Sequence, residues 1–469
     1  MPEVRVDAGS FRDPAGFVYR RGGRLLRQIN PSGVPLYRAL MDSGLYHTLV
    51  QDGLLVAHQE VDLSEAATEE AALVLAPEAL PFISYPYEWS FSQLKDAALL
   101  TLDVQRRAIE AGLTTRDASA YNVQWDGHRP VFIDTLSLGP WTDGRPWEGY
   151  QQFCRHFLAP LALAVAGGPA LLSTLRVHLD GVPLQLASRL LGGSTWMRFG
   201  LLTHVHLHAR SIDKHGGQAG GGAGEAAPPM SRTAMLALIE SLRGTVLGLK
   251  LPAQRSEWAA YYDATNYSQA GRDHKGLLVR SFLEQLAATG PLDLVWDLGA
   301  NTGVYSRIPA ELGARVIAFD IDEGAVEQHY LALRGASEQG SLTPLRLDLR
   351  NPSPGLGWAH EERASLQGRG PADAVMALAL IHHLAISNNT PLDHIARYLS
   401  RLGRHLILEM VPKEDSQVQR LLASRSDIFP DYTIDGFELA FSRHFEIVRR
   451  EPIPDTRRYL YLLRARAER

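Results

Sequence analysis

A stretch of glycine and alanine that ends in Pro-Pro, HGGQAGGGAGEAAPP (215–229), interrupts this chain of 469 residues near its middle. Such a composition favours a flexible connector over a helix or a strand. A chain of this length is also too long for one hydrophobic core, so two domains are expected. We therefore predict an N-terminal domain over residues 1–212, a linker over 213–230, and a C-terminal domain over 231–469 that begins with a helical lead-in.

The composition is that of an ordinary globular protein, with 45% hydrophobic and 21% charged residues. A formal net charge of -5 provides no general attraction to nucleic acid or to an anionic membrane, so neither is expected as a partner. Cys154 is the single cysteine, which excludes an intramolecular disulfide and is consistent with a reducing cytoplasm, the expected location. The apolar segment 157–175 contains two prolines and a Gly-Gly pair, which favour broken buried helices over a membrane span.

From about residue 290 the sequence alternates apolar strands with glycine turns and helices. This alternation predicts an α/β domain with a parallel, Rossmann-like sheet that helices cover on both faces. Near the end, FEIVRRE and RRYLYLLRA are separated only by PIPDT, too short for a helical crossover, so a terminal antiparallel hairpin is expected. The parallel strands are predicted in DLVWDL, RVIAFDI, LTPLRLDL, DAVMALAL and RHLILEMV.

The turn from Asp297 to Gly303, DLGANTG, lies between a predicted strand and a predicted helix. Glycine lets the backbone approach a ligand closely there, and the following helix N-terminus offers free N–H groups. Asp320 ends the second strand, where a carboxylate can accept hydrogen bonds from ribose hydroxyls, and Asp322 is the alternative. Asp348 ends the third strand and can accept a hydrogen bond from an adenine amino group in the same crevice.

A dinucleotide-binding turn would need G-x-G-x-x-G, but Asn301 and Val304 replace its second and third glycines. Instead, VWDLGANTG, VIAFDID, LRLDL, DAVMALALIHHL and the closing hairpin resemble the class I S-adenosylmethionine-dependent methyltransferases over about residues 255–469. The resemblance implies that the turn holds the methionine part of the cofactor, Asp320 the ribose, and Asp348 with Leu349 the adenine. The expected cofactor-binding residues are Asp297, Gly299, Ala300, Asn301, Gly303, Asp320, Asp322, Asp348, Leu349, Tyr267 and Lys275.

Tyr267 and Lys275 enter that set because they precede the first strand, where related enzymes often cover the cofactor. His382 and His383 follow the fourth strand, where acceptor and sulfonium meet in related folds. An imidazole with a pKa near neutrality is the expected base for a hydroxyl or an amine. The alternative is that one of these histidines packs or orients the loop.

The segment RDASAYNVQWDGHRPVFID (116–134) brings a different chemistry to the N-terminal half. Asp117, Asn122 and Asp134 follow the order of the catalytic carboxylate and the two metal ligands of a kinase. The segment resembles the corresponding loops of the protein-kinase-like fold, including phosphotransferases of the aminoglycoside type. The resemblance implies an α+β kinase-like domain in which Asn122 and Asp134 hold Mg²⁺ with a nucleotide. A capped turn without such a function is the alternative.

The kinase-like fold uses a lysine on an N-terminal strand to hold the nucleotide phosphates, but this chain has no lysine before Lys95. Arg24 and Arg27 are the candidates to replace it, although a planar guanidinium differs from an ammonium point charge. RDPAGFVY also lacks the usual glycine-rich loop. We therefore expect a kinase-like shape with lost or altered phosphotransfer.

Together these patterns predict a two-part enzyme that methylates a small molecule or a protein, with the kinase-like domain in a binding or regulatory role. The whole chain is similar to bacterial two-part methyltransferases that are sometimes likened to nodulation proteins. One alternative is an ATP-dependent phosphotransferase with a second domain that senses S-adenosylmethionine. Another is a non-enzymatic binding module in both halves.

Overall fold

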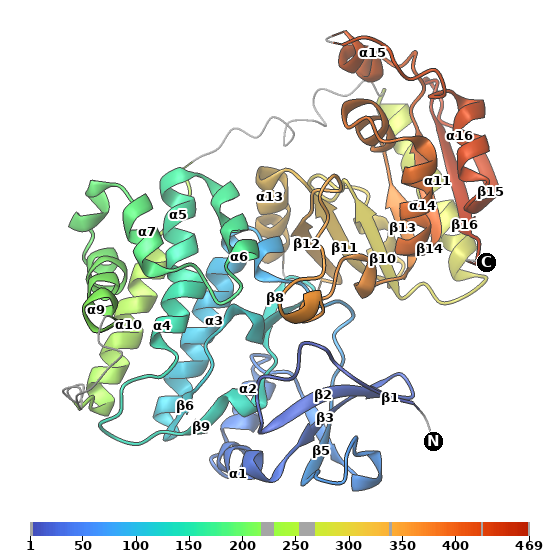
Figure 1. Cartoon of the computed structure of the whole chain (residues 1–469). Helices are drawn as coiled ribbons and strands as arrows, with labels where there is room; N and C mark the ends of the chain where they lie inside the picture. Colours follow the sequence, from blue (N-terminus) through green and yellow to red (C-terminus); the bar gives the residue numbers. More distant parts are fainter. Residues whose placement is uncertain (1–2, 217–228, 253–267, 337–339, 424, 468–469) are drawn as a thin grey trace. The chain divides into compact units, whose positions relative to one another are not determined.

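The chain divides into two compact units in the computed structural model (Figure 1). Unit 1 comprises Met1–Ala253 together with Gly357–Arg363, and unit 2 comprises Gln254–Leu356 together with Ala364–Arg469. Most of the predicted linker lies outside the described residues. The structure describes residues 3–216, 229–252, 268–336, 340–423 and 425–467.

Unit 1 begins with a five-stranded antiparallel sheet in the order β1-β2-β3-β5-β4. Gly22 and Gly23 connect β2 to β3 with φ angles of 56° and 84°. Such two-residue turns match the twist of the strands and favour glycine, which has no side chain to clash at positive φ. The strands are β1 (Val4–Val6), β2 (Gly16–Arg21), β3 (Arg24–Ile29), β4 (His58–Val61) and β5 (Leu73–Pro77).

A long helix, α3 (Phe91–Glu110), follows this sheet. Ser90 and Gln93 begin it with a capping box, in which each side chain accepts a hydrogen bond from the backbone N–H of the other residue. Two short antiparallel strand pairs, β6 (Leu113–Thr115) with β9 (Leu138–Pro140) and β7 (Val123–Asp126) with β8 (Arg129–Phe132), come next. The other helices of unit 1 are α1 (Val34–Asp42), α2 (Leu45–Gln51), α4 (Tyr150–Phe153), α5 (Ala159–Gly167), α6 (Thr174–Val177), α7 (Leu184–Leu190), α8 (Phe199–Leu201), α9 (His208–Gly216) and α10 (Arg232–Gly248).

The uncharged segment 157–175 is not one continuous helix. Helix α5 ends at Gly167. The next residue, Gly168, has a φ of 100°, outside the helical range, and a short 3-10 helix, Pro169–Ser173, follows. Among the residues that the structure describes, no helix is long and apolar enough to cross a lipid bilayer.

Helix α10 belongs to unit 1, although the segment from residue 231 was expected to open the C-terminal domain. Both of its ends are tied to α3. Arg232 donates a hydrogen bond of 2.7 Å to the carbonyl of Glu110, and Lys95 Nζ donates to the carbonyls of Leu247 and Leu249 at 3.0 and 2.7 Å. The division between the units therefore lies between Ala253 and Gln254 and not at the linker.

Unit 2 contains a seven-stranded sheet in the order β12-β11-β10-β13-β14-β16-β15. The five predicted strands of the α/β pattern are present and pair in parallel. The predicted terminal hairpin is also present, with β16 antiparallel to β14 and β15 at the sheet edge. The strands are β10 (Leu294–Leu298), β11 (Arg315–Asp320), β12 (Leu342–Arg346), β13 (Ala372–Ala377), β14 (Gly403–Met410), β15 (Phe445–Pro452) and β16 (Tyr459–Ala465).

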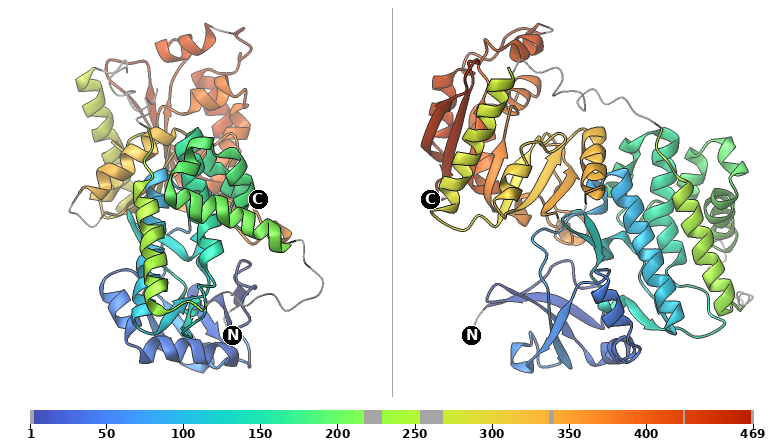
Figure 2. Two further views of the ribbon diagram at one scale, coloured as in Figure 1. Left: turned by 90° about the vertical axis from the view of Figure 1, so that its left-hand side faces the viewer. Right: turned by 180° about the vertical axis from the view of Figure 1, so that it is seen from behind.

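Apolar side chains bury both faces of this sheet. On one face, helix α11 lies against the strands (Figure 2). Its Phe282 packs in a buried cluster with Val295 of β10 and Leu460 of β16. On another part of unit 2, the Phe437 ring of α16 lies 4.8 Å from that of Tyr461 on β16. The continuous apolar strands are thus explained by burial between helices. The helices are α11 (Gln269–Ala287), α12 (Arg307–Glu311), α13 (Glu323–Arg334), α14 (Leu392–Leu402), α15 (Ser416–Leu422) and α16 (Ile434–Phe441).

The assignment of α10 to unit 1 leads to a prediction on the stability of that unit. Leu242 is fully buried on α10, so Leu242→Ala should destabilise unit 1 by about 2–5 kcal/mol. Leu247 on the same helix is 44% exposed, and Leu247→Ala should cost less than about 1 kcal/mol. Hydrogen exchange followed by mass spectrometry measures both effects. Leu242→Ala should speed exchange in α3 and leave β10 to β14 unchanged, and faster exchange in those strands instead would contradict the assignment.

Candidate functional site

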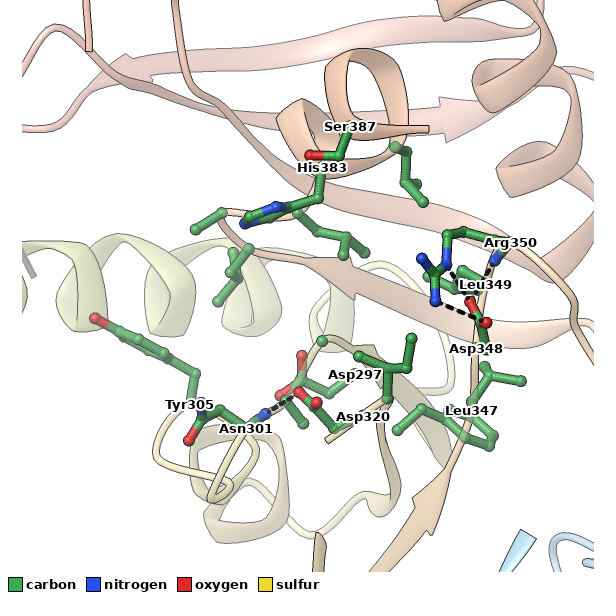
Figure 3. Close-up of a pocket in the computed structure, with 18 of the residues that line it drawn as sticks. Asp297, Asn301, Tyr305, Asp320, Leu347, Asp348, Leu349, Arg350, His383 and Ser387 are labelled. Atoms are coloured by element: carbon green, nitrogen blue, oxygen red, sulfur yellow. Dashed lines mark hydrogen bonds and ion pairs between the residues drawn. The ribbon is translucent and has the colours of Figure 1, made fainter. Parts of the chain in front are cut away.

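A pocket of about 470 Å³ lies at the carboxyl ends of β10, β11, β12 and β13 (Figure 3). The strand order reverses at β10, because β11 and β13 lie on its two sides. Connections that leave such a point in opposite directions open a crevice at the strand ends. The predicted residues that line the pocket are Lys275, Asp297, Gly299, Ala300, Asn301, Asp320, Asp348, Leu349 and His383.

The turn after β10 has the backbone conformation that its glycines suggested. Gly299 and Gly303 have φ angles of 78° and 79°, and Asn301 between them has a φ of 52°. Asparagine tolerates this left-handed region better than most residues. Its side-chain oxygen also accepts a hydrogen bond of 2.7 Å from the N–H of Thr302. Asn301 thus adopts a positive φ that glycine would otherwise favour.

Gly303 lies directly against the ring of His329 on α13. A Cβ atom at this position would be 2.1 Å from an atom of that ring, so no larger residue fits. Burial lowers the pKa of His329 to about 4, which keeps the ring uncharged at neutral pH. The sequence contained no signal for this contact, because a histidine on an amphipathic helix has many possible neighbours.

Asp320 and Asp322 have different roles. The Asp320 carboxylate accepts hydrogen bonds from the N–H groups of Asn301 at 2.7 Å and Asp322 at 2.8 Å, and it lines the pocket. Its pKa is raised, chiefly by burial. The Asp322 carboxylate instead accepts from the N–H of Ala325 at 2.7 Å and caps α13. Of the two candidates for the ribose, the structure therefore brings Asp320 to the pocket.

Asp348 lies two residues after the end of β12, and Arg350 lies beside it (Figure 3). The guanidinium of Arg350 donates two hydrogen bonds to this carboxylate, from Nε at 2.9 Å and from Nη2 at 3.1 Å. Burial raises the pKa of Asp348, but the bonds from Arg350 outweigh burial and the net pKa is lowered. Arg350 also lines the pocket. Sequence analysis missed it, although its position two residues after Asp348 was a possible signal.

Asp297 is the most deeply buried carboxylate of the pocket. It accepts a hydrogen bond of 2.6 Å from the hydroxyl of Ser306. Burial raises the pKa of Asp297 to about 7, while the Ser306 bond and the charge of Lys275 act in the opposite direction. Burial thus disfavours the charged form of this side chain. Ser306 is a second residue that the sequence did not identify.

Lys275 is part of a buried ionic network. Its ammonium lies 2.6 Å from Glu409 of β14 and 4.4 Å from the centre of the Tyr305 ring. Glu409 also pairs with Arg458 at 2.9 Å, and Arg458 pairs with Asp415 at 2.7 Å. Buried charges are stable only when they are paired in this way. The other predicted residue ahead of the first strand, Tyr267, lies outside the described residues.

The structure distinguishes the two adjacent histidines. His383 lines the pocket (Figure 3), and burial lowers its pKa. His382 is 1% exposed, and neither of its ring nitrogens has a hydrogen-bond partner. Burial, followed by the charges of His383 and Arg458, lowers the pKa of His382 well below its ordinary value. His383 is thus the histidine that a bound molecule can reach.

In unit 1, Asp117, Asn122 and Asp134 meet in one hydrogen-bonded cluster. The Asn122 amide donates to the carbonyl of Asp117 at 3.2 Å and to the Ser137 hydroxyl at 3.1 Å. That hydroxyl donates to Asp134 at 2.6 Å. Asp134 also pairs with Arg27 of β3 at 2.5 Å. Of the two arginines considered in place of a lysine, Arg27 therefore reaches the cluster.

No protein-family model matches the chain. Among solved structures, magnesium protoporphyrin IX methyltransferase (ChlM) from Synechocystis PCC 6803, with S-adenosylhomocysteine bound, is 22% identical, with 44% of this chain and 92% of that chain covered and a TM-score of 0.31. The bifunctional kinase-methyltransferase WbdD is 17% identical, with 44% of this chain and 42% of that chain covered and a TM-score of 0.30.

Nodulation protein NoeA of Rhizobium meliloti (strain 1021) is 37% identical to the chain over 459 residues. The similarity covers 97% of this chain and 95% of that protein, so it includes both units. Because it extends through almost the full length of both proteins, the chain belongs to the family of nodulation protein NoeA.

Proposed function

We propose that unit 2 transfers a methyl group from S-adenosylmethionine to a hydroxyl or an amine of a small molecule or a protein and releases S-adenosylhomocysteine. The observation that carries this proposal is the meeting of Asp297, Asp320 and Asp348, from the ends of three neighbouring strands, in one pocket. Asp297 and Asp320 lie beside each other, and Asp348 lies apart from them with Arg350 (Figure 3). The first experiment is incubation of the protein with cell extract and labelled S-adenosylmethionine, with and without ATP. Label in a small molecule or a protein identifies the acceptor class.

The hydrogen bonds that these carboxylates already make support the proposed roles. Each oxygen of Asp320 accepts a backbone N–H and keeps lone-pair capacity for the two ribose hydroxyls. The Oδ2 atom of Asp348 accepts one bond from Arg350 and can accept another from the adenine amino group. In our proposal the turn from Gly299 to Gly303 contacts the methionine part, with Asp297 and Lys275 behind it.

The bound cofactor would supply a methyl group on a sulfonium, which is already a good leaving group. The protein then has to align the acceptor with that methyl group and remove its proton. We assign proton removal to His383, because it faces the pocket and its lowered pKa keeps the imidazole free to accept a proton at neutral pH. The new bond joins the acceptor oxygen or nitrogen to the methyl carbon, the carbon–sulfur bond breaks with its electron pair on sulfur, and the acceptor proton moves to His383.

We further propose that unit 1 has a kinase-like arrangement, because Asp117, Asn122 and Asp134 converge beside the strand that carries Arg27. Its role in this proposal is binding or regulation. The same cluster is the observation in favour of the second candidate function, an ATP-dependent phosphotransferase whose second unit senses S-adenosylmethionine. Consumption of ATP by the protein that Asp117→Asn abolishes would favour this second function.

The role of Asp320 predicts a loss of cofactor affinity in Asp320→Asn. Charge-assisted hydrogen bonds to the ribose would be lost, so the dissociation constant of S-adenosylmethionine should rise about tenfold or more, or ~1.5 kcal/mol. Asp322→Asn is the matched control, because asparagine also caps helices and affinity should stay within about twofold. Calorimetry on the full chain measures both. Equal affinity of Asp320→Asn and the wild type would remove Asp320 from this role.

Substitutions of the two histidines should have different effects on the turnover number. His383→Gln should lower the turnover number by about 100-fold or more, with little change in cofactor affinity, because a general base is lost. His382→Phe keeps the volume of a ring whose nitrogens have no partner, so turnover should remain close to that of the wild type. Wild-type turnover should fall with decreasing pH only below the ordinary histidine pKa of about 6.5, because burial lowers the pKa of His383. Full turnover in His383→Gln would place the base elsewhere.

A further inference from the structure

The cluster in unit 1 contains a cationic side chain at the position where a metal ion would be expected. Arg27 lies on β3, and its guanidinium is 13% exposed. Its Nη1 atom lies 2.5 Å from Oδ1 of Asp134, a carboxylate that is itself only 20% exposed. A kinase-like site would instead use this aspartate as a metal ligand. We therefore compared the donors around Asp134 with the needs of Mg²⁺.

Three groups of the chain already bind the Asp134 carboxylate. Oδ1 receives Arg27 and the N–H of Leu136, at 2.5 and 3.0 Å, and Oδ2 receives the hydroxyl of Ser137 at 2.6 Å. Mg²⁺ requires oxygen ligands at about 2.0–2.1 Å in near-octahedral geometry. At Oδ1 a cation of that kind would compete with the guanidinium, because two positive charges at one carboxylate oxygen repel each other strongly at this distance.

The side chain of the second predicted metal ligand is held in the same hydrogen-bonded cluster. Asn122 uses its amide nitrogen for the carbonyl of Asp117 and for the hydroxyl of Ser137. The hydroxyl in turn donates to Asp134, so an ordered chain of hydrogen bonds connects Asn122 with Asp134 and ends at Arg27. The residues present thus fit an internal ion pair and do not fit a magnesium site.

The ionisation of the pair supports the same conclusion. Burial raises the pKa of Asp134, but the charge of Arg27 and the hydrogen bonds from Ser137 and Leu136 outweigh burial, and the net pKa is lowered. Arginine stays protonated at any pH at which the protein is folded. The pair therefore remains charged on both sides across the neutral range.

In a kinase, the loop between the first two strands covers the nucleotide phosphates. In unit 1, the loop between β1 and β2 contacts another segment of the unit. Arg12 of this loop pairs with Glu362 of the Gly357–Arg363 segment of unit 1 at 2.7 Å. A Cβ atom on Gly9 would be 2.6 Å from the carbonyl oxygen of Glu362. The guanidinium of Arg363 stacks on the ring of Tyr121 at 3.9 Å, next to Asn122. Contacts within unit 1 thus occupy both the loop between β1 and β2 and the turn that carries Tyr121 and Asn122.

We infer that Arg27 replaces the divalent cation at Asp134, so that unit 1 holds its kinase-like site together without Mg²⁺. This inference rests on the proposed kinase-like arrangement of unit 1 but is independent of methyl transfer by unit 2. It differs from the expectation that Asn122 and Asp134 bind a metal ion. It also means that a molecule bound by unit 1 would be recognised through the chain's own guanidinium and hydroxyl groups.

Titration of the full chain with Mn²⁺, a paramagnetic substitute for Mg²⁺, tests the inference by electron paramagnetic resonance of the free ion. In the wild-type background, Asp134→Asn should not reduce the binding of Mn²⁺. Arg27→Met removes the guanidinium at similar length and should create a Mn²⁺ site, and Asp134→Asn in the same chain should abolish it. Arg24→Met, an exposed arginine on the same strand, is the matched control and should create none.

Two results would overturn the inference. One is a Mn²⁺ site in the wild type that Asp134→Asn abolishes, which needs no Arg27 variant and therefore decides the question even if Arg27→Met fails to fold. The other is a folded Arg27→Met chain that gains no Mn²⁺ site. Binding of S-adenosylmethionine, measured on the same samples, should be equal in all variants. A chain without cofactor binding would count against the methyltransferase proposal and leave the metal result intact.

Discussion

The reversal of strand order at β10 is the constraint on which the candidate site of unit 2 depends. Because β11 and β13 lie on either side of β10, the loops at its carboxyl end diverge and leave room for a ligand. Residues that are far apart in the sequence meet there only because each ends a strand. Asp297, Asp320 and the segment of Asp348 follow this rule. The chemistry of the pocket is therefore a direct consequence of the sheet order.

The same crevice places charges in a poorly hydrated environment, so each charge needs a partner of opposite sign. Lys275, Glu409 and Arg458 are almost completely buried, and each is paired with an opposite charge. Removal of one partner from such a network typically leaves an uncompensated charge and destabilises the fold. The network also connects α11 with β14 and, through Asp415, with the first turn of α15. Leu421 of α15 lines the pocket, so these pairs hold a wall of the site in place.

Local sequence patterns predicted the parts of the fold that depend on local spacing. The parallel strands of unit 2 and the terminal hairpin follow from apolar runs, glycine turns and the short PIPDT connection. The unit to which α10 belongs was not predictable, since an amphipathic helix beside a linker suits either neighbour. The contacts of His329 and Ser306 also depend on tertiary placement.

Arg24 and Arg27 show why such choices need a structure. Residues three apart on a strand point to opposite faces, so at most one of the two arginines can face the cluster of Asp134. The sequence contains both and offers no reason to prefer either. Pairing of β3 with β2 and β5 sets the face on which Arg27 lies. The register of the sheet, and not the residue type, thus decides which charge reaches the carboxylate.

Aspartates at the two candidate sites differ in what their neighbours leave available. Asp320 accepts N–H groups of its own turn, which orient the carboxylate and leave lone pairs toward the pocket. Asp134 accepts a guanidinium, a hydroxyl and an N–H, which neutralise its charge from within the fold. A carboxylate that accepts neutral N–H groups keeps its net negative charge. When a carboxylate is paired with arginine, the guanidinium balances that charge, and a further cation is attracted less strongly. Residue type and order alone therefore suggest two sites for a bound molecule, but the hydrogen-bond donors around each carboxylate support ligand binding in unit 2 and an internal ion pair in unit 1.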